Sequence, residues 1–495
     1  MNQLHLFLPC AAGVEDFLAD EVHTITGASG QDLLVGRGGV MVRGAWRDVL
    51  QLNLHSRLAQ RVLIELALQD YRSENDLYRA ASQVSWEVWF DPQRTFKVEV
   101  TAQHSPLTSL NFAALRVKDA VADRFRAKRG GVRPSVETHH PDVRIHLHLT
   151  TDTATLYIDT SGEALFKRGW REDTGDAPLK ETLAAAMIAA TGWNPHGDHP
   201  QPLYDPCCGS GTVVIEAAQI ARRIPAGILR RFAFEKLIPF QRHVWEGMLD
   251  EAEAQILDTS PVPIYGSDIS HRMVDFAQRN AERAGVLDTI ELRGGDALQR
   301  MPPSATAGIL LINPPYGERI AAAGVAGQNA EQRAEQRFGQ HSERYSARDN
   351  DRFSPRHTGQ PAALRPQQQG RESAIVQTGG ASDDFFAQLA SHWKKNYSGW
   401  TAWILSPDLQ LSRRMRLKES RRVPVWNGPI ECRLMRFDLM AGSMQRPKPD
   451  AANAAATPSS ASTPPAATSQ APSAKPSAAP AQTQPKAAPT NGAPA

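Results

Sequence analysis

Short apolar runs and one helical repeat organise the first part of the chain, up to about residue 170. Runs typical of β-strands lie at residues 5–10, 95–102, 143–150 and 153–161. Residues 14–25 (VEDFLADEVHTI) instead place their apolar side chains at helical spacing, directly after Gly13. In the last strand Leu156 and Ile158 share one face, and the residues between them share the other, which is typical of a half-buried strand. We therefore expect an α+β region here.

From about residue 179 to 441 the pattern changes to apolar strands that alternate with helices. Helices are predicted at residues 179–193, 211–223, 271–285 and 383–396. Strands are predicted at residues 202–208, 264–268, 290–296, 308–316 and 399–406. This alternation predicts a mostly parallel sheet that helices cover on both faces. Ligands of such sheets bind beyond the carboxyl ends of the strands, so we look for chemistry there.

Two segments lack any such periodicity. Residues 321–380 are rich in Gln, Arg, Gly, Ser and Glu, and they predict a disordered insertion within the second region. Residues 446–495 are mostly Ala, Pro, Ser, Thr and Gln, so they contain few large apolar side chains that could offset the entropy cost of ordering. We expect a disordered tail there, and we expect neither segment to carry the chemistry.

The composition is that of an ordinary globular protein of two to four domains. The chain has 495 residues, of which 41% are hydrophobic and 22% are charged, and its formal net charge of +2 does not by itself predict nucleic-acid binding. Its four cysteines form no C-x-x-C pair, and no spacing typical of metal ligands occurs elsewhere, so we predict no metal site. No apolar stretch reaches the length of a membrane span, and the amino-terminal residues lack a basic signal-peptide segment. We therefore expect a soluble, cytoplasmic protein without a membrane partner.

The sequence DPCCGSGT, from Asp205 to Thr212, marks the first predicted strand end and the start of a helix. Gly209, Ser210 and Gly211 predict a turn that a ligand approaches closely, with helix N–H groups free to bind an anionic end. Such a turn also serves plain strand–helix packing, and that alternative stays open at this point.

Two aspartates end the next two predicted strands. Asp268 is a candidate acceptor for two ribose hydroxyls, and Asp296 for an adenine amino group, although each could simply terminate a strand or a turn. Asp268 follows Asp205 by 63 positions (268 − 205), so residues from about 224 to 262 must leave the core pattern. This spacing and the absence of a third glycine argue against a nicotinamide-binding fold.

The fourth strand runs into NPPY, residues 313–316. Proline fixes its own backbone and holds the preceding residue extended, so the Asn313 side-chain oxygen and the Pro314 carbonyl oxygen are rigidly placed. These two acceptors could take the two N–H groups of an exocyclic base amine, which directs the nitrogen lone pair at an incoming methyl group. Tyr316 would provide a flat face for stacking of the base.

The four strand-end motifs, in this order, resemble the class I S-adenosylmethionine-dependent methyltransferases. NPPY resembles the subset that methylates exocyclic amines of bases, and by itself it does not distinguish guanine from adenine. Cys207 and Cys208 raise a rival hypothesis, in which a thiolate attacks a pyrimidine ring. We reject it because both cysteines lie in the DPCCGSGT turn, which the resemblance assigns to the cofactor, and because the fourth motif has Asn-Pro where those enzymes have Cys.

Residues 141–173 and the following APLKETLAAAMI resemble the THUMP-domain methyltransferases. Most of residues 1–445, apart from the insertion, more closely resemble the bacterial 23S rRNA guanine-N2 methyltransferases of the RlmL type. The resemblance rests on the segment from the PDVR strand through FKRGWR, on PLKETLAAA, on NPPYGER and on NGPIEC. It implies a Rossmann-like class I methyltransferase domain preceded by an α+β ferredoxin-like and THUMP region that binds RNA. The implied domains are residues 1–50 (ferredoxin-like), 51–165 (THUMP), 166–192 (a connecting helix) and 193–445 (methyltransferase). Some members of the family also have a domain that makes 7-methylguanine, an activity that we expect to be absent here.

The resemblance also implies roles for individual residues. The predicted catalytic residues are Asn313, Pro314 and Tyr316. The predicted S-adenosylmethionine-binding residues are Asp205, Gly209, Ser210, Gly211, Thr212, Asp268, Asp296 and, as a weaker transfer, Thr182. Basic residues that could grip ribosomal RNA phosphates are Arg124, Arg126, Lys128, Arg129, Lys167 and Arg168. Solvated helix faces are the alternative for these cations, and a DNA or RNA adenine methyltransferase or a non-catalytic RNA-binding assembly factor are the alternatives for the whole chain.

Overall fold

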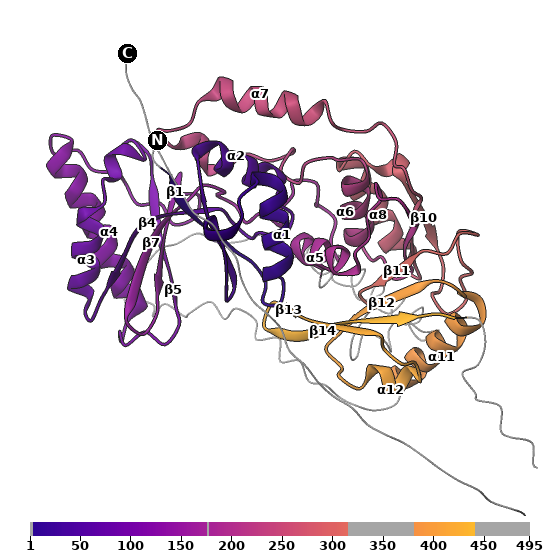
Figure 1. Ribbon diagram of the computed structural model, residues 1–495. Helices are drawn as coiled ribbons and strands as arrows, with labels where there is room; N and C mark the ends of the chain where they lie inside the picture. The colour runs from indigo at the N-terminus through magenta and orange to yellow at the C-terminus, as the bar shows by residue number, and fades with distance from the viewer. Residues whose placement is uncertain (1–2, 176–177, 315–380, 441–495) are drawn as a thin grey trace, which may run out of the picture. The chain divides into compact units, whose positions relative to one another are not determined.

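The amino-terminal half folds around a mixed β-sheet with the strand order β2-β3-β1-β4-β7-β6-β5 (Figure 1). The strands are β1 (Leu4–Pro9), β2 (Leu33–Gly36), β3 (Gly39–Gly44), β4 (Leu63–Asp70), β5 (Phe96–Ala102), β6 (Val143–Leu149) and β7 (Thr153–Asp159). Neighbouring strands are antiparallel except for β5 and β6, which run parallel. The strands and the first helix predicted from the apolar pattern are thus confirmed, as is the α+β character of this region.

The structure is a computed structural model, and it describes residues 3–175, 178–314 and 381–440, with side chains of the last range from residue 385 onward. All of these residues belong to one compact unit of the chain. The predicted insertion at 321–380 and the predicted tail at 446–495 lie outside the described residues.

Helices of the first region pack on this sheet with their apolar faces inward. They are α1 (Glu15–Thr26), α2 (Trp46–His55), α3 (Glu74–Gln83) and α4 (Leu110–Lys128). The helix α1 ends at Gly27, whose φ of +74° is a left-handed conformation that glycine adopts without strain. The helix α4 begins after Ser109, whose hydroxyl oxygen accepts a hydrogen bond from the Phe112 backbone N–H (3.2 Å).

The strand β7 differs from the half-buried strand that its alternation suggested. Thr155, Tyr157 and Asp159 are buried as well as Leu156 and Ile158. The reason is that β7 lies in the sheet interior, between β4 and β6, and both of its faces are covered. Asp159 is tolerated there because Arg61 and His146 lie against its carboxylate.

The second region contains a sheet with the strand order β10-β9-β8-β11-β12-β14-β13. The strands are β8 (Leu203–Asp205), β9 (Ile264–Asp268), β10 (Ile290–Gly294), β11 (Ile309–Ile312), β12 (Thr401–Ser406), β13 (Arg421–Asn427) and β14 (Ile430–Asp438). The strands from β10 to β12 run parallel, and β14 and β13 add an antiparallel edge. A mostly parallel sheet, as predicted from the alternation of strands and helices, is confirmed.

Both faces of this sheet are covered. The helices are α5 (Glu181–Thr191), α6 (Thr212–Ala221), α7 (Arg242–Glu253), α8 (His271–Arg283), α11 (Ala381–Asn396) and α12 (Leu411–Met415). On β11, Ile309 and Leu311 join the hydrophobic cluster that contains α5 and α6, whereas Leu310 and Ile312 join a second cluster that contains α11. Alternate residues of one strand therefore meet helices on opposite faces.

The excursion predicted after the first helix of this region is present at residues 222–263 and contains α7. It reaches back to the amino-terminal half, because the Phe234 N–H donates to the Thr160 carbonyl (2.9 Å) and the Ile238 N–H donates to the Trp89 carbonyl (2.8 Å). A second close contact between the amino-terminal half and the second region is formed at Gly13, which has a φ of +83°. A Cβ atom there would lie 2.0 Å from the Pro424 carbonyl oxygen of β13.

Candidate active site

The predicted strand-end motifs gather at one edge of the parallel sheet. The strands β8, β9 and β11 end at Asp205, Asp268 and Ile312, and the Asp205 position pairs with Gly266 while Gly294 pairs with Asp268. Because these strands are parallel and adjacent, their carboxyl ends open onto the same edge. The predicted location of the motifs is therefore confirmed, whereas their roles remain predictions.

The turn between β8 and α6 has the geometry of a ligand-binding turn. Gly209 and Gly211 have φ values of +53° and +89°, which favour glycine at both positions. Gly211 is also close-packed, since an added Cβ would lie 3.0 Å from the Cβ of Ala277. The Gly209 N–H donates to Asp268 Oδ2 (3.0 Å), so the turn is tied to the end of the next strand.

Three aspartates lie at the ends of neighbouring strands. Asp205 ends β8, Asp268 ends β9 and accepts from the turn, and Asp296 follows β10. Burial raises the pKa of Asp205 to about 8, and burial also raises the pKa of Asp268. Asp205 Oδ1 accepts from the Cys207 N–H (3.0 Å), Asp268 Oδ1 from the Ser270 N–H (2.9 Å), and Asp296 Oδ1 from the Leu298 N–H (2.9 Å). Each carboxylate thus stabilises its own turn and still has lone pairs to accept further hydrogen bonds. Such acceptors fit a cofactor that presents ribose hydroxyls, an amine and a positive charge.

Arg171 connects the turn between β8 and α6 to the start of α5. Its guanidinium donates to Ser210 Oγ (3.1 Å), Thr212 Oγ1 (2.7 Å) and the Leu179 carbonyl oxygen (3.2 Å), and it pairs with Glu181 Oε1 (2.7 Å). The hydroxyls of Ser210 and Thr212, which we predicted to bind the cofactor, are therefore oriented by Arg171. Thr182, the weaker of the predicted residues, is buried in the first turn of α5, next to Glu181.

Asn280 of α8 supports the same turn from another side. Its side-chain amide donates to the Ser210 carbonyl oxygen (3.0 Å) and to the Asp173 carbonyl oxygen (2.9 Å). Neither Arg171 nor Asn280 was among the residues predicted from the sequence. Arg171 lies in FKRGWR, a motif that the sequence singled out as a whole, whereas Asn280 has no signal beyond its place on the apolar face of a helix.

Asn313 and Pro314 follow β11 directly, in the middle of the sheet between β8 and β12. Pro314 is buried and Asn313 is half-buried. They therefore lie at the same edge as Asp205, on the neighbouring strand. Tyr316, the third predicted catalytic residue, lies outside the described residues.

The two adjacent cysteines have the wrong chemistry for nucleophilic attack. Burial raises the pKa of both thiols, Cys207 and Cys208, and the nearby carboxylates of Asp205 and Asp268 raise it further. A neutral thiol is a poor nucleophile. This electrostatic environment supports the rejection of the thiolate hypothesis.

Arg168 was predicted to contact RNA, and this prediction is wrong. Its side chain is 1% exposed and donates to both carboxylate oxygens of Glu216 in α6 (3.0 and 3.4 Å). Arg57 pairs with the same carboxylate (3.0 Å), and the Arg168 guanidinium also donates to the Arg57 carbonyl oxygen (2.7 Å). The basic residue instead forms a buried ion triad that joins the amino-terminal half to α6. Glu216 is the only charged residue of α6, and that position was the available sequence signal.

Most of the other predicted RNA contacts are engaged with the protein. Arg124 pairs with Glu87 (2.6 Å), Arg129 donates to the Glu87 carbonyl (2.9 Å), and Arg126 pairs with its helix neighbour Asp123 (2.8 Å). Lys128 is exposed, and Lys167 is exposed although it pairs with Glu163. Surface ion pairs of this kind are weak and can exchange for phosphate. Arg124 is mainly structural, because its side chain is only 19% exposed.

Within residues 3–175, 178–314 and 381–440 no group of three or more His, Cys, Asp or Glu side chains could hold a metal ion. In the same ranges no helix is both long and apolar enough to cross a membrane.

Three family models match the chain in order. An RlmL ferredoxin-like domain matches residues 5–63, a THUMP domain matches residues 71–159, and an RMKL-like methyltransferase domain matches residues 168–345. The first two matches span most of the amino-terminal sheet, and the third spans β8, β9, β10 and β11 of the second sheet.

Curated relatives and solved structures agree with these domains. The ribosomal RNA large subunit methyltransferase K/L of Shewanella amazonensis is 32% identical over 449 residues, which are 90% of this chain and 54% of that protein. The chain therefore spans about half the length of the curated relatives it matches.

Two crystal structures have the same fold. That of the methyltransferase SMU.472 in complex with SAH (S-adenosylhomocysteine) has a TM-score of 0.70 at 24% identity, over 90% of this chain and all of that one. That of a Listeria monocytogenes protein, titled an N6-adenine-specific DNA methylase, has a TM-score of 0.68 at 25% identity, over 88% of this chain and 96% of that one. The chain therefore contains an RlmL-type ferredoxin-like domain, a THUMP domain and an RMKL-like class I methyltransferase domain, for which the methyl donor is S-adenosylmethionine.

Proposed function

We propose that this protein transfers a methyl group from S-adenosylmethionine to the exocyclic N2 amine of a guanine in 23S ribosomal RNA. The observation that carries the proposal is the position of Asn313 and Pro314 at the end of β11, beside the strand that leads into the glycine turn. The name of the Shewanella relative supports ribosomal RNA as the substrate, and the matched THUMP domain supports RNA binding.

The protein's task in this reaction is to orient a weak nucleophile. An exocyclic amine is unreactive because its lone pair is delocalised into the ring. The Asn313 side-chain oxygen and the Pro314 carbonyl oxygen accept its two N–H groups, which makes the nitrogen more tetrahedral and directs its lone pair. The sulfonium donor supplies an electrophilic methyl carbon: a new N–C bond forms, the C–S bond electrons return to sulfur, and the nitrogen sheds one proton to water.

The remaining site residues would hold the cofactor in place. Asp268 would accept from the ribose hydroxyls and Asp296 from the adenine amino group, as the strand-end positions of both side chains suggest. Gly209 and Gly211 would allow the amino-acid part of the cofactor to approach the backbone, and the carboxyl oxygen of Asp205, which accepts from the Cys207 N–H, would hold the start of this turn in place.

The experiment that tests the substrate is methyl transfer from labelled S-adenosylmethionine. Ribosomal RNA from cells that lack the gene, ribosomal RNA from wild-type cells and duplex DNA are incubated with the protein, and the nucleosides are then identified by mass spectrometry. We expect labelled N2-methylguanosine only in the RNA from the deletion strain. Labelled N6-methyladenine in DNA or RNA would instead support the second candidate, which the name of the Listeria structure favours.

An Asn313→Ala variant tests the chemistry. We expect turnover to fall by a factor of roughly hundreds, since one preorganised acceptor is lost. The affinity for S-adenosylhomocysteine should stay near that of the wild type, because Asn313 is assigned to the base. Equal activity of variant and wild type would refute the assigned role, and absence of activity in both would favour a non-catalytic RNA-binding protein.

A further inference from the structure

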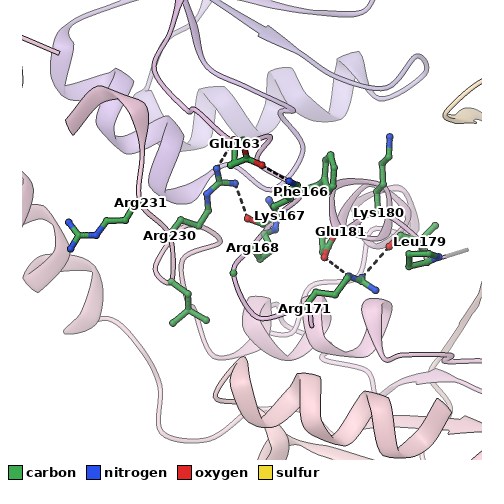
Figure 2. Close-up of a pocket in the computed structure, with 13 residues that line it drawn as sticks. Glu163, Phe166, Lys167, Arg168, Arg171, Leu179, Lys180, Glu181, Arg230 and Arg231 are labelled. Atoms are coloured by element: carbon green, nitrogen blue, oxygen red, sulfur yellow. Dashed lines mark hydrogen bonds and ion pairs between the residues drawn. The ribbon is translucent and has the colours of Figure 1, made fainter. Parts of the chain in front are cut away.

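A cavity of about 650 Å³ lies beside the start of α5 (Figure 2). Its walls come from residues 163–171, which follow the amino-terminal sheet, from residues 178–181 and from residues 229–231 of the excursion after α6. The volume lies within the range of small-ligand pockets. Gly169 shapes one wall: it has a φ of +102°, and an added Cβ would lie 2.8 Å from the Leu229 carbonyl oxygen.

The lining is strongly basic. It holds six cationic side chains and two carboxylates. The carboxylate of Glu181 is held by Arg171, and that of Glu163 pairs with Lys167. Arg231 is 86% exposed, and its Nη1 lies 3.0 Å from Oε2 of Glu235, four residues further on, so this surface pair is weak and open to an incoming anion. No carboxylate of the described residues forms an ion pair with Lys180.

The cavity also presents apolar surface beside these charges. Phe166 is half-buried, and the Lys180 ammonium lies 5.3 Å from the centre of its ring, as Figure 2 lets the reader follow. Leu229 is 49% exposed and lines the same cavity. An aromatic ring next to several cations is the combination that proteins use to bind single-stranded nucleic acid, because the ring stacks on a base and the cations bind phosphate.

One residue of the cavity wall, Arg171, is hydrogen-bonded to the turn between β8 and α6. The Arg171 guanidinium lines the cavity and donates to Ser210 Oγ and Thr212 Oγ1. An RNA strand held in the cavity would therefore lie one side chain away from the turn that holds the methyl donor. Enzymes that extrude a target base also contact its flanking nucleotides, and a cavity beside this turn could provide such a contact.

We propose that this cavity binds one nucleotide of the substrate RNA strand next to the target, with its base against Phe166 and with backbone phosphates on either side of it near Lys180 and near Arg231. The inference rests on the proposed function, because it assumes that RNA is the substrate. It assigns substrate binding to the junction between the two sheets, in addition to the matched THUMP domain.

The test compares two cavity variants with a matched surface control. Phe166→Leu keeps apolar volume but removes the stacking face, and Arg231→Ala removes one cation. Arg242→Ala is the control, since Arg242 is also an exposed arginine (73%) with an i,i+4 glutamate partner but lies outside the cavity lining. The probes are a 23S ribosomal RNA transcript, for binding and methylation, and labelled S-adenosylhomocysteine, for cofactor binding.

We expect Phe166→Leu to raise the Kd for the transcript about fivefold or more. Arg231→Ala should lower the slope of log K against log salt by about 0.7, as for one lost phosphate contact on a single strand. Both variants should bind S-adenosylhomocysteine as the wild type does, and Arg242→Ala should match the wild type throughout. A midpoint temperature of thermal unfolding equal to that of the wild type would verify that the variants are folded.

Two results would overturn the proposal. The first is unchanged RNA binding of both cavity variants in a protein whose wild type methylates the transcript, which leaves the proposed function intact. The second is a loss of S-adenosylhomocysteine affinity without a loss of RNA affinity, which would assign the cavity to the cofactor. If the wild type methylates no ribosomal RNA but the two variants still bind the transcript more weakly, the proposed function fails and the RNA-binding cavity stands.

Discussion

Glu216→Gln is expected to destabilise the folded protein by about 3–5 kcal/mol, the usual cost of breaking a buried ion pair by removing one partner. Glu216 is fully buried and receives hydrogen bonds from both Arg57 and Arg168. Burial alone would raise the pKa of Glu216, but the two guanidinium groups lower it, so the side chain is charged at neutral pH. Glutamine keeps one oxygen acceptor and removes the charge, so Arg57 and Arg168 lose the carboxylate that pairs with both of them.

The magnitude follows from the contacts themselves. Glu216 accepts three hydrogen bonds from the two arginines, at 3.0, 3.0 and 3.4 Å, and a hydrogen bond to a charged group contributes about 1.5–3 kcal/mol. The amide oxygen of glutamine can still accept a hydrogen bond, so part of this stabilising free energy is retained. A loss of two such contacts therefore gives about 3 kcal/mol or more, in agreement with the value for buried pairs in general.

Urea unfolding followed by tryptophan fluorescence measures this loss, and urea is preferred because guanidinium ions would screen the charges. The control is Glu251→Gln, since Glu251 pairs with Arg47 on the surface (3.2 Å) and should cost less than about 1 kcal/mol. Replacement of Glu216 together with Arg57 and Arg168 by methionine should recover most of the stability. A Glu216→Gln variant within 1 kcal/mol of the wild type would refute the reasoning that the triad is a desolvated, mutually dependent unit.

Three further predictions concern the cofactor turn and the backbone. Arg171→Ala should raise the Kd for S-adenosylhomocysteine about tenfold in calorimetry, because the turn loses two hydrogen bonds; an unchanged Kd would exclude this positioning role. Asp205 has a folded pKa of about 8 against 3.8 unfolded, so its contribution to stability is present below pH 4 and is lost as the pH rises toward 8. Thermal melts at several pH values should therefore show Asp205→Asn gaining stability over the wild type across this interval, and a constant difference would contradict the pKa. Gly13→Ala should destabilise by more than about 2 kcal/mol because its Cβ meets Pro424, whereas Gly27→Ala, with a similar φ and nothing within 4 Å, should cost about 1 kcal/mol in the same urea experiment.

The fold could be predicted from the sequence wherever the apolar period was long and regular. Strands such as β9 (Ile264–Asp268) and helices such as α8 (His271–Arg283) were predicted to within two residues, because each has one dominant period and a clear end. The position of β7 within its sheet was not predictable in this way. Its alternation suggested an open face, but its burial depends on its neighbours in space and not on its own residues.

In the candidate site, too, local features could be predicted from the sequence, whereas contacts between distant residues could not. Gly209 and Asp268 were predicted because a glycine turn and an acidic strand end are local features of the sequence. Arg171 was missed as a residue that orients the turn, and Arg168 was assigned to RNA, because the partner of an arginine lies elsewhere in the chain. A positive charge in a motif predicts an anion, but only the fold decides whether that anion is a phosphate or a glutamate of the same protein.

The contact between Gly13 and Pro424 has a consequence for folding of the chain during its synthesis on the ribosome. The two residues are 411 positions apart (424 − 13), and the backbones meet closely. At a synthesis rate of about 5–20 residues per second, β13 emerges roughly 20–80 s after the loop on which it packs. During that interval the nascent amino-terminal sheet has this surface open to water and to chaperones, so the antiparallel edge of the second sheet completes the assembly as its last step.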